Sequence, residues 1–159
     1  MKHFIEEFYE AFKSHNYQGM IKHYHAEAKF WDPVFEDLPS NEVQAMWHML
    51  VTRAKEIEIR YDDFKLDSEL QRATIKWEAI YPYGPKRRIV HNKITSQFEI
   101  LDGKIYRQKD TFDFKQWLGM ALGPVGKIFG FTSFLQNKVK HTAQTGLKLF
   151  IQRNPQYQK

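Results

Sequence analysis

The hydrophobic pattern of this chain changes its period near Glu56, and this change constrains the fold more than any other feature. Before that point, apolar side chains recur at helical spacing, which predicts helices over residues 2–14, 17–24 and from Ser40 or Asn41 onward, with one short strand before the third helix. After it, apolar and polar residues alternate, which predicts long strands over residues 57–62, 73–81, 88–100 and 105–114. This order predicts an α+β domain in which a curved antiparallel sheet packs one face on the helices.

Two turns and one apolar stripe support this assignment. Tyr83-Gly84-Pro85 separates the second long strand from the third, and the Asp102-Gly103 pair is typical of a tight hairpin before the last strand. In the third helix, the stripe that faces the core consists of Val43, Met46, Trp47 and Leu50. A chain of 159 residues with this pattern is long enough to bury a core as a single domain.

The short strand ends in Asp32-Pro33, between apolar residues on both sides. Pro33 favours an extended backbone at Asp32, so the carboxyl group is expected at a strand end. Burial there would raise the pKa of the carboxyl group and suit it to proton transfer. The alternative is an ordinary Asp-Pro turn with the carboxylate in water.

The composition supplies large rings and excludes cysteine chemistry. Aromatic residues make up 16% of the chain, which suits an aromatic core or an aromatic-lined pocket. The absence of cysteine excludes disulfides, thiolate nucleophiles and cysteine-based zinc sites. His23 and His25 are expected at a helix end with their rings apart and no third ligand, so we expect no metal. The first residues lack the pattern of a signal peptide, and we expect a cytoplasmic protein.

The segment Tyr24–Pro33, together with the order of elements, resembles the nuclear-transport-factor-2-like superfamily, and most closely its SnoaL-like and ketosteroid-isomerase-related branch. The hairpin Phe98–Ile105 resembles the final hairpin of that family, with one residue inserted. The resemblance covers residues 1–114 and implies a cone-shaped fold with a single cavity. It also implies a homodimer formed through the outer face of the sheet and places the catalytic base of the family at Asp32. Residues 115–159 are then a C-terminal helical extension.

Two further positions depart from the ketosteroid isomerase pattern. Phe8, next to Tyr9, stands where that family has its oxyanion tyrosine, and Ile94 stands where it has a protonated aspartate. Donors aimed at developing charge supply a large share of the rate in such enzymes. We therefore do not expect steroid isomerase activity.

Strand alternation offers other polar groups for the same pocket. On the last strand Tyr106, Gln108, Asp110 and Phe112 share one face, and on the preceding strand Val90, Asn92, Ile94, Ser96 and Phe98 share the inward face. Asp32 and Asp110 are the candidate catalytic residues, and the candidate ligand-binding residues are Tyr24, Trp47, Trp77, Asn92, Gln108 and Phe112. Tyr24 is expected beside Asp32, and His91 is expected to face outward. Each of these groups also has a purely structural interpretation, as a packed ring or as a polar side chain with a routine partner.

The C-terminal segment leaves more than one interpretation open. Residues 118–135 contain one charged residue, Lys127, and four glycines, which makes a poor membrane span. The segment could be a docked helical hairpin, a lid over the pocket, or a surface that meets lipid or a partner. A further helix with a lysine-rich side is predicted over residues 134–151. The basic triplet Lys86–Arg88 follows a turn, and we expect no nucleic-acid partner.

These features predict a protein that binds a small apolar molecule in an interior cavity. The reaction would be an isomerisation, cyclisation or hydration that needs acid–base chemistry and no cofactor. The alternatives are a non-catalytic binding module that uses the same cavity, and an interaction domain that uses residues 115–159 to contact lipid or a partner.

Overall fold

The computed structural model describes residues 2–158, apart from the side chain of Asp63. Two helices, α1 (Lys2–Lys13) and α2 (Tyr17–Ile21), come first, followed by strands β1 (Tyr24–Trp31) and β2 (Leu38–Pro39) and helix α3 (Ser40–Arg53). The long strands are β3 (Glu58–Asp67), β4 (Arg72–Tyr83), β5 (Arg88–Leu101) and β6 (Lys104–Thr111). The chain ends with helices α4 (Phe114–Leu122), α5 (Pro124–Phe129) and α6 (Ser133–Arg153) and the 3₁₀ turn Pro155–Tyr157.

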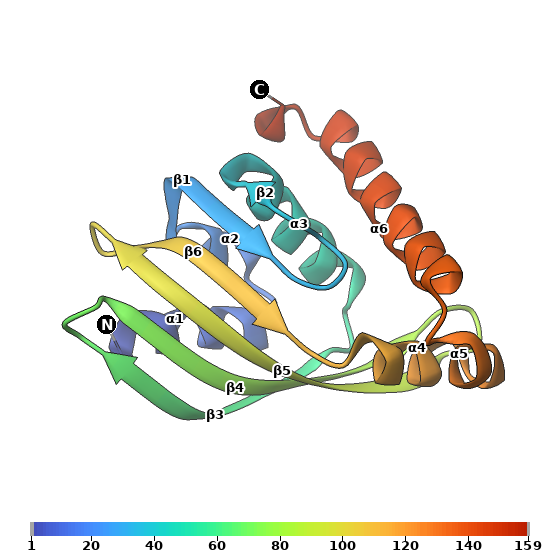
Figure 1. The fold of residues 1–159 in the computed structure, drawn as a ribbon. Helices are drawn as coiled ribbons and strands as arrows, with labels where there is room; N and C mark the ends of the chain where they lie inside the picture. Colours follow the sequence, from blue (N-terminus) through green and yellow to red (C-terminus); the bar gives the residue numbers. More distant parts are fainter. Residues whose placement is uncertain (1, 159) are drawn as a thin grey trace.

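The six strands form one curved sheet in the order β2-β1-β6-β5-β4-β3 (Figure 1). Strands β3 to β6 are antiparallel neighbours, as predicted, whereas β1 pairs with β6 in parallel. This pairing puts the first strand of the chain beside the last one. In the β5–β6 turn, Asp102 and Gly103 have φ angles of 50° and 71°, the left-handed conformation that a tight hairpin turn requires.

Period-two alternation determines which side of the sheet is buried. On β5, the five residues predicted to face inward are all buried, and His91 is exposed on the outer face, where its ring contacts Glu78 at 2.7 Å. The helices α1 and α3 cover the inner face with aromatic rings. Phe8 makes edge contacts with Tyr24, Trp47 and Phe98, so the core is built mainly from large rings.

Several predicted boundaries were wrong. Helix α2 ends at Ile21, and Tyr24 begins β1, because this segment pairs with β6. Neither Ser40 nor Asn41 caps α3: the Ser40 hydroxyl donates to the His25 carbonyl, and the Asn41 amide donates to the Tyr157 carbonyl. Leu50 is partly exposed, whereas the other three residues of the predicted stripe are buried.

The three C-terminal helices pack on this domain at two places. Helices α4 and α5 lie at the end of the sheet where β4 turns into β5, and α6 runs back over α3 (Figure 1). Trp117 and Leu118 of α4 join Val90 of β5 in a second apolar cluster, and Leu147 of α6 is buried in the main core. No helix within residues 2–158 is long and apolar enough to cross a membrane.

Candidate functional site

Asp110 is the centre of a buried network of polar side chains inside the fold. Two chains of hydrogen bonds converge on its Oδ1 atom. In the first, the Ser96 hydroxyl donates to Asp110 Oδ1 at 2.5 Å and accepts from Trp77 Nε1 at 2.8 Å. In the second, Gln108 Nε2 donates to the same Oδ1 at 3.0 Å.

The second chain continues to α3 through β1. The Tyr24 hydroxyl donates to Gln108 Oε1 and accepts from Trp47 Nε1, which lies 2.7 Å away. The indole N–H is only ever a donor, so each chain has a fixed direction that runs from an indole to Asp110. Both chains end on Oδ1, which leaves Oδ2 as the oxygen that carries the proton when Asp110 is protonated.

The environment of Asp110 favours the protonated form near neutral pH. Burial raises the pKa of the Asp110 carboxyl to about 7, although the hydrogen bonds from Ser96 and Gln108 act in the opposite direction, and the Asp32 charge raises it further. Burial, and then the Asp110 charge, also raise the pKa of Tyr24 and of Tyr9 well above the ordinary tyrosine value. Both tyrosines therefore stay neutral and act in the network as hydroxyl groups.

Asp32 combines the two interpretations that its sequence left open. Its Oδ1 accepts the backbone N–H groups of Val34 at 2.7 Å and Phe35 at 2.6 Å, so it does form an Asp-Pro turn. The carboxyl is nevertheless largely removed from water, and this burial raises its pKa to about 6 against the lowering effect of the two backbone N–H groups and Lys140. At neutral pH, Asp32 is thus the more acidic of the two carboxyl groups.

Strand pairing brings Asp32 near the strand that carries Asp110. In the parallel pair, Phe30 of β1 lies opposite Gln108 of β6, and both are buried on the inner side. The last paired residues are Trp31 and Lys109, and Asp32 and Asp110 directly follow them in the chain. The charge of Asp32 accordingly acts on Asp110.

Around this pair lie three partly buried residues, Val34, Tyr81 and Phe112, which contact both the main core and the second apolar cluster. Helix α6 covers the same place: Gln144 Nε2 donates to the Val34 carbonyl at 3.1 Å, and Lys140 pairs with Glu36 at 3.2 Å. The two acids therefore lie where the sheet domain meets its C-terminal extension.

The other predicted site residues divide into two groups. Trp47, Trp77, Tyr24 and Gln108 belong to the network, whereas Asn92 is buried on the same face of β5 without joining it. Two predictions were wrong. The Tyr24 hydroxyl donates to Gln108 and accepts from Trp47, so its hydrogen bonds do not go to Asp32. Tyr106 does not share the inward face, because a bulge between Glu99 and Ile100 turns Ile105 inward in its place.

Sequence reasoning missed Ser96 and Tyr9 as members of the site. Ser96 is completely buried and receives the Tyr9 hydroxyl at 3.3 Å in addition to the Trp77 indole. The available signal was the position of Ser96 on the inward face of an otherwise apolar strand. The register that places Ser96 opposite Asp110 could not be read from the pattern.

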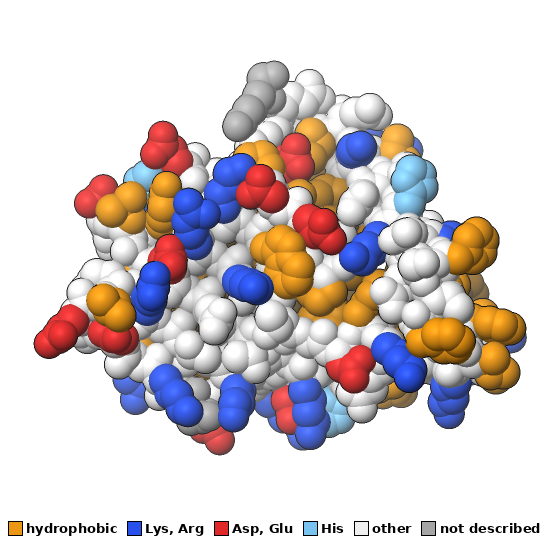
Figure 2. Space-filling view, viewed as in Figure 1, with side chains coloured by type: hydrophobic (Ala, Val, Ile, Leu, Met, Phe, Trp, Pro, Cys, Tyr) orange, Lys and Arg blue, Asp and Glu red, His pale blue; other side chains and the backbone are white. Residues whose placement is uncertain are grey.

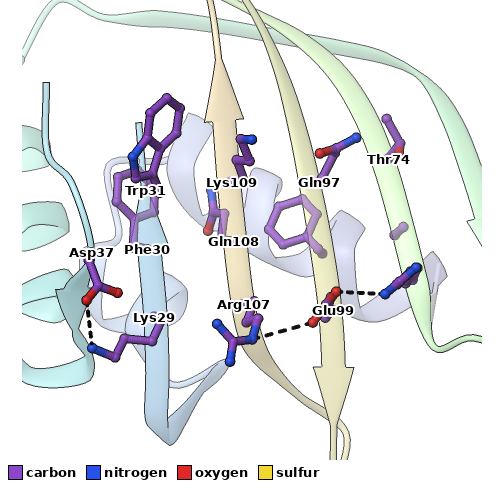
Figure 3. Close-up of a pocket in the computed structure, with 13 residues that line it drawn as sticks. Lys29, Phe30, Trp31, Asp37, Thr74, Gln97, Glu99, Arg107, Gln108 and Lys109 are labelled. Atoms are coloured by element: carbon purple, nitrogen blue, oxygen red, sulfur yellow. Dashed lines mark hydrogen bonds and ion pairs between the residues drawn. The ribbon is translucent and has the colours of Figure 1, made fainter. Parts of the chain in front are cut away.

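The space expected for a ligand is filled by side chains. The interior where the network meets α1 is occupied by the rings of Phe8, Phe98, Trp47 and Trp77. Two hollows open instead on the outer face of the sheet, and the larger has a volume of about 450 Å³ (Figure 3). Charged side chains line the larger hollow, with Lys109 at 5.1 Å from the centre of the Trp31 ring. A ligand beside Asp110 would therefore need a rearrangement of the rings or of the extension.

Metal coordination has no support in the part of the chain described. Among the side chains that the structure describes, no three His, Asp or Glu are grouped closely enough to hold a metal ion. His23 contacts Phe4, and the Nδ1 atom of His25 accepts the Glu27 backbone N–H.

Comparison with known proteins gives a consistent result. The sequence pattern of the SnoaL-like domain family matches residues 5–108. Among solved structures, a nuclear-transport-factor-2-like protein of unknown function from Burkholderia pseudomallei has a TM-score of 0.64 and 13% identity, covering 76% of this chain and 95% of its own. No curated protein matches the sequence significantly.

Two further solved structures are similar and carry named activities. An epoxide hydrolase from M. tuberculosis has a TM-score of 0.63 and 16% identity over 80% of this chain and 91% of its own. A putative polyketide cyclase from Xanthomonas campestris pv. campestris has a TM-score of 0.62 and 11% identity over 76% and 95%. Identities this low establish a shared fold and no particular reaction.

Proposed function

Because the chain belongs to the SnoaL-like domain family, we propose that it binds a small, mostly apolar molecule beside Asp32 and Asp110 and transfers protons with these two groups. The observation that carries this proposal is the asymmetry between the carboxyl groups. Asp110 is buried on the inner face of the sheet, Asp32 is partly buried in the turn after β1, and burial raises their pKa values to about 7 and about 6. Pairs of acids with separated pKa values are a common basis of acid–base catalysis.

Their surroundings assign a role to each group. Asp32, whose pKa is about 6, is mostly ionised at neutral pH and is the candidate base. Asp110, whose Oδ1 is occupied by Ser96 and Gln108, would present a proton from Oδ2 to a carbonyl, epoxide or hydroxyl oxygen. An isomerisation, cyclisation or hydration would need these two roles and no cofactor.

At the two positions where ketosteroid isomerases have their oxyanion donors, this chain has residues that favour a different substrate. Phe8 and Ile94, which occupy them, are both buried and apolar. The neighbouring Tyr9 hydroxyl is directed to Ser96 and so supports Asp110 indirectly. We therefore propose a reaction other than steroid isomerisation.

Deuterium exchange tests this proposal without knowledge of the natural substrate. The protein is incubated in D₂O with 2-tetralone, a small cyclic ketone with acidic C–H groups, and uptake of deuterium is followed by mass spectrometry. We expect catalysed uptake that falls about 10²-fold or more in Asp32→Asn, since a positioned base contributes that much. The matched control is Asp37→Asn, an exposed acid five residues along the chain.

The same experiment separates catalysis from binding alone. Saturable binding of 2-tetralone without deuterium uptake, measured by calorimetry, would favour the non-catalytic binding module. Equal uptake by the wild type and Asp32→Asn would contradict the role proposed for Asp32.

A further inference from the structure

Helix α5 and the residue that ends it bury glycines and expose large apolar side chains, which is the opposite of an ordinary surface helix. A Cβ atom built on Gly126 would lie 1.9 Å from the Leu118 carbonyl oxygen, so only glycine allows this approach of α5 to the α4 backbone. Gly130, which ends α5, is also confined, because a built Cβ would lie 2.3 Å from the carbonyl oxygen of Gly126 in the same helix. With the glycine side turned inward, the bulky side of α5 faces away from the protein.

The outward side of α5, together with the segment that leads into α6, carries a group of exposed apolar side chains at the end of the molecule. Its members are 53–77% exposed, and we call them the apolar tip: Val125, Ile128, Phe129, Phe131 and Phe134. Figure 2 shows the orange side chains gathered at the right-hand end, where Figure 1 places α5. Isolated exposed apolar residues are common on proteins, but a contiguous group of this size marks a contact surface.

The charge around the tip points to the kind of surface that it contacts. Residues 114–159 contain seven Lys and Arg and no Asp or Glu, whereas residues 1–113 contain 17 Lys and Arg and all 19 acidic residues. Lys127 lies within α5 itself, and Lys138 follows Phe134 by one helical turn, so both border the tip. The Arg88 side chain packs against Gly123, where a built Cβ would lie 2.5 Å from Arg88 Cζ.

We propose that the apolar tip inserts into the surface of an anionic lipid membrane. Phe131 and Phe134 would enter the boundary between headgroups and acyl chains, while Lys127 and Lys138 contact the lipid phosphates. A second copy of the chain is a poorer occupant, because a symmetric contact through the tip would bring together two segments of like charge. The proposal is independent of the reaction proposed above.

Vesicle flotation of the full chain tests this inference. Neutral phosphatidylcholine vesicles are compared with vesicles that contain roughly 30% phosphatidylglycerol. The first variant, Phe131→Ser/Phe134→Ser, removes two rings of the tip, and the second, Lys127→Gln/Lys138→Gln, removes two charges. The matched control, Leu70→Ser/Leu101→Ser, changes two exposed leucines in the hairpins at the opposite end of the sheet. All six side chains are exposed, and circular dichroism verifies that each variant is folded.

The wild type and the control should float with the anionic vesicles. With the neutral vesicles, both proteins should stay unbound at the bottom of the gradient. We expect the phenylalanine pair to weaken binding by about tenfold or more, and the lysine pair by about fivefold for each charge. Binding should also fall when salt rises from about 0.1 M to 1 M, because the screening length shortens from about 10 Å to 3 Å. Absence of flotation with anionic vesicles, or equal loss in the control, would overturn the proposal. So would dissociation of a lipid-free dimer by Phe131→Ser/Phe134→Ser, which would make the partner a second copy.

Discussion

At the scale of single residues, burial is the main reason that the pKa values of both aspartates are raised, and the hydrogen bonds that they accept act in the opposite direction. Asp32 accepts backbone N–H groups in its own turn, whereas Asp110 accepts from side chains within the core. Trp47 and Trp77 can only donate, so the Tyr24 hydroxyl donates onward to Gln108 and the Ser96 hydroxyl donates onward to Asp110. At neutral pH, Asp32 is therefore mostly ionised, whereas Asp110 is about half protonated.

Asp110→Asn should change the dependence of stability on pH. The folded pKa of Asp110, about 7, lies above the ordinary value near 4, so the folded state retains a proton that the unfolded state loses. Stability should therefore fall as pH rises from about 4 to 7 and then level off, by at most on the order of 4 kcal/mol from this group. Asparagine resembles the protonated acid, and urea denaturation at several pH values should show a smaller fall and a variant more stable than wild type at high pH. A parallel pH dependence in both proteins would contradict the raised pKa.

Ser96→Ala should lower the free energy of unfolding by a large amount for the loss of one hydroxyl group. It removes the donor to Asp110 and leaves the Trp77 indole and the Tyr9 hydroxyl without their acceptor in the core. We expect a loss of about 2–4 kcal/mol in the free energy of unfolding, measured by urea denaturation. Ser68→Ala, at an exposed turn, should change it by less than about 0.5 kcal/mol. A similar small change in both variants would show that the network contributes little to stability.

At the scale of elements, the hydrophobic period and the turn residues predict those structural features that depend on residues close together in the sequence. The inward face of β5 and the Asp102-Gly103 turn could be read from the sequence because each depends on neighbouring residues. The parallel register of β1 and β6, which pairs Trp31 with Lys109 just before Asp32 and Asp110, depends on residues about 80 positions apart and could not be read. The bulge at Glu99 was equally hidden, and it reversed the predicted face of Tyr106. The Asp110 network was missed in part because side-chain direction depends on rotamers.

The close approach of α4 and α5 can be tested by adding one methyl group at Gly126. Gly126→Ala places a Cβ 1.9 Å from the Leu118 carbonyl oxygen, so the helices must separate, at a cost of about 2–3 kcal/mol. Gly146→Ala, in α6, meets its nearest atom at 3.6 Å and should stabilise by up to about 1 kcal/mol through helix propensity. Thermal unfolding followed by circular dichroism should show melting shifts of opposite sign. Shifts of the same sign and size would mean that α4 and α5 do not pack closely in solution.

At the scale of the whole molecule, the SnoaL-like fold is closed at one end by its own C-terminal helices. Helix α6 contacts the turn that carries Asp32, while α4 covers the end of β5. Access to the candidate site is thus coupled to the docking of the extension. The outer face of the sheet stays open, with Trp31 and Lys109 beside the larger hollow (Figure 3).

That outer face should form a homodimer. Light scattering coupled to gel filtration should give about twice the chain mass of 19.1 kDa. Trp31→Glu should yield the monomer, because it places two like charges in a symmetric interface. The Glu27→Gln variant, which changes an exposed residue of the same strand, serves as the control. A monomeric wild type at high protein concentration would contradict this assembly.

The proposed function depends most directly on Asp32 and Asp110 having pKa values near neutrality, with the charge of Asp32 acting on Asp110. Titration of the aspartate carboxyl carbons by NMR measures this directly in the unmodified protein, with Asp32→Asn and Asp110→Asn providing the assignments. We predict apparent pKa values of about 6 and about 7, and a lower value for Asp110 when Asp32→Asn removes the neighbouring charge. Titration of both groups near 4, with no response of Asp110 to Asp32→Asn, would contradict the account.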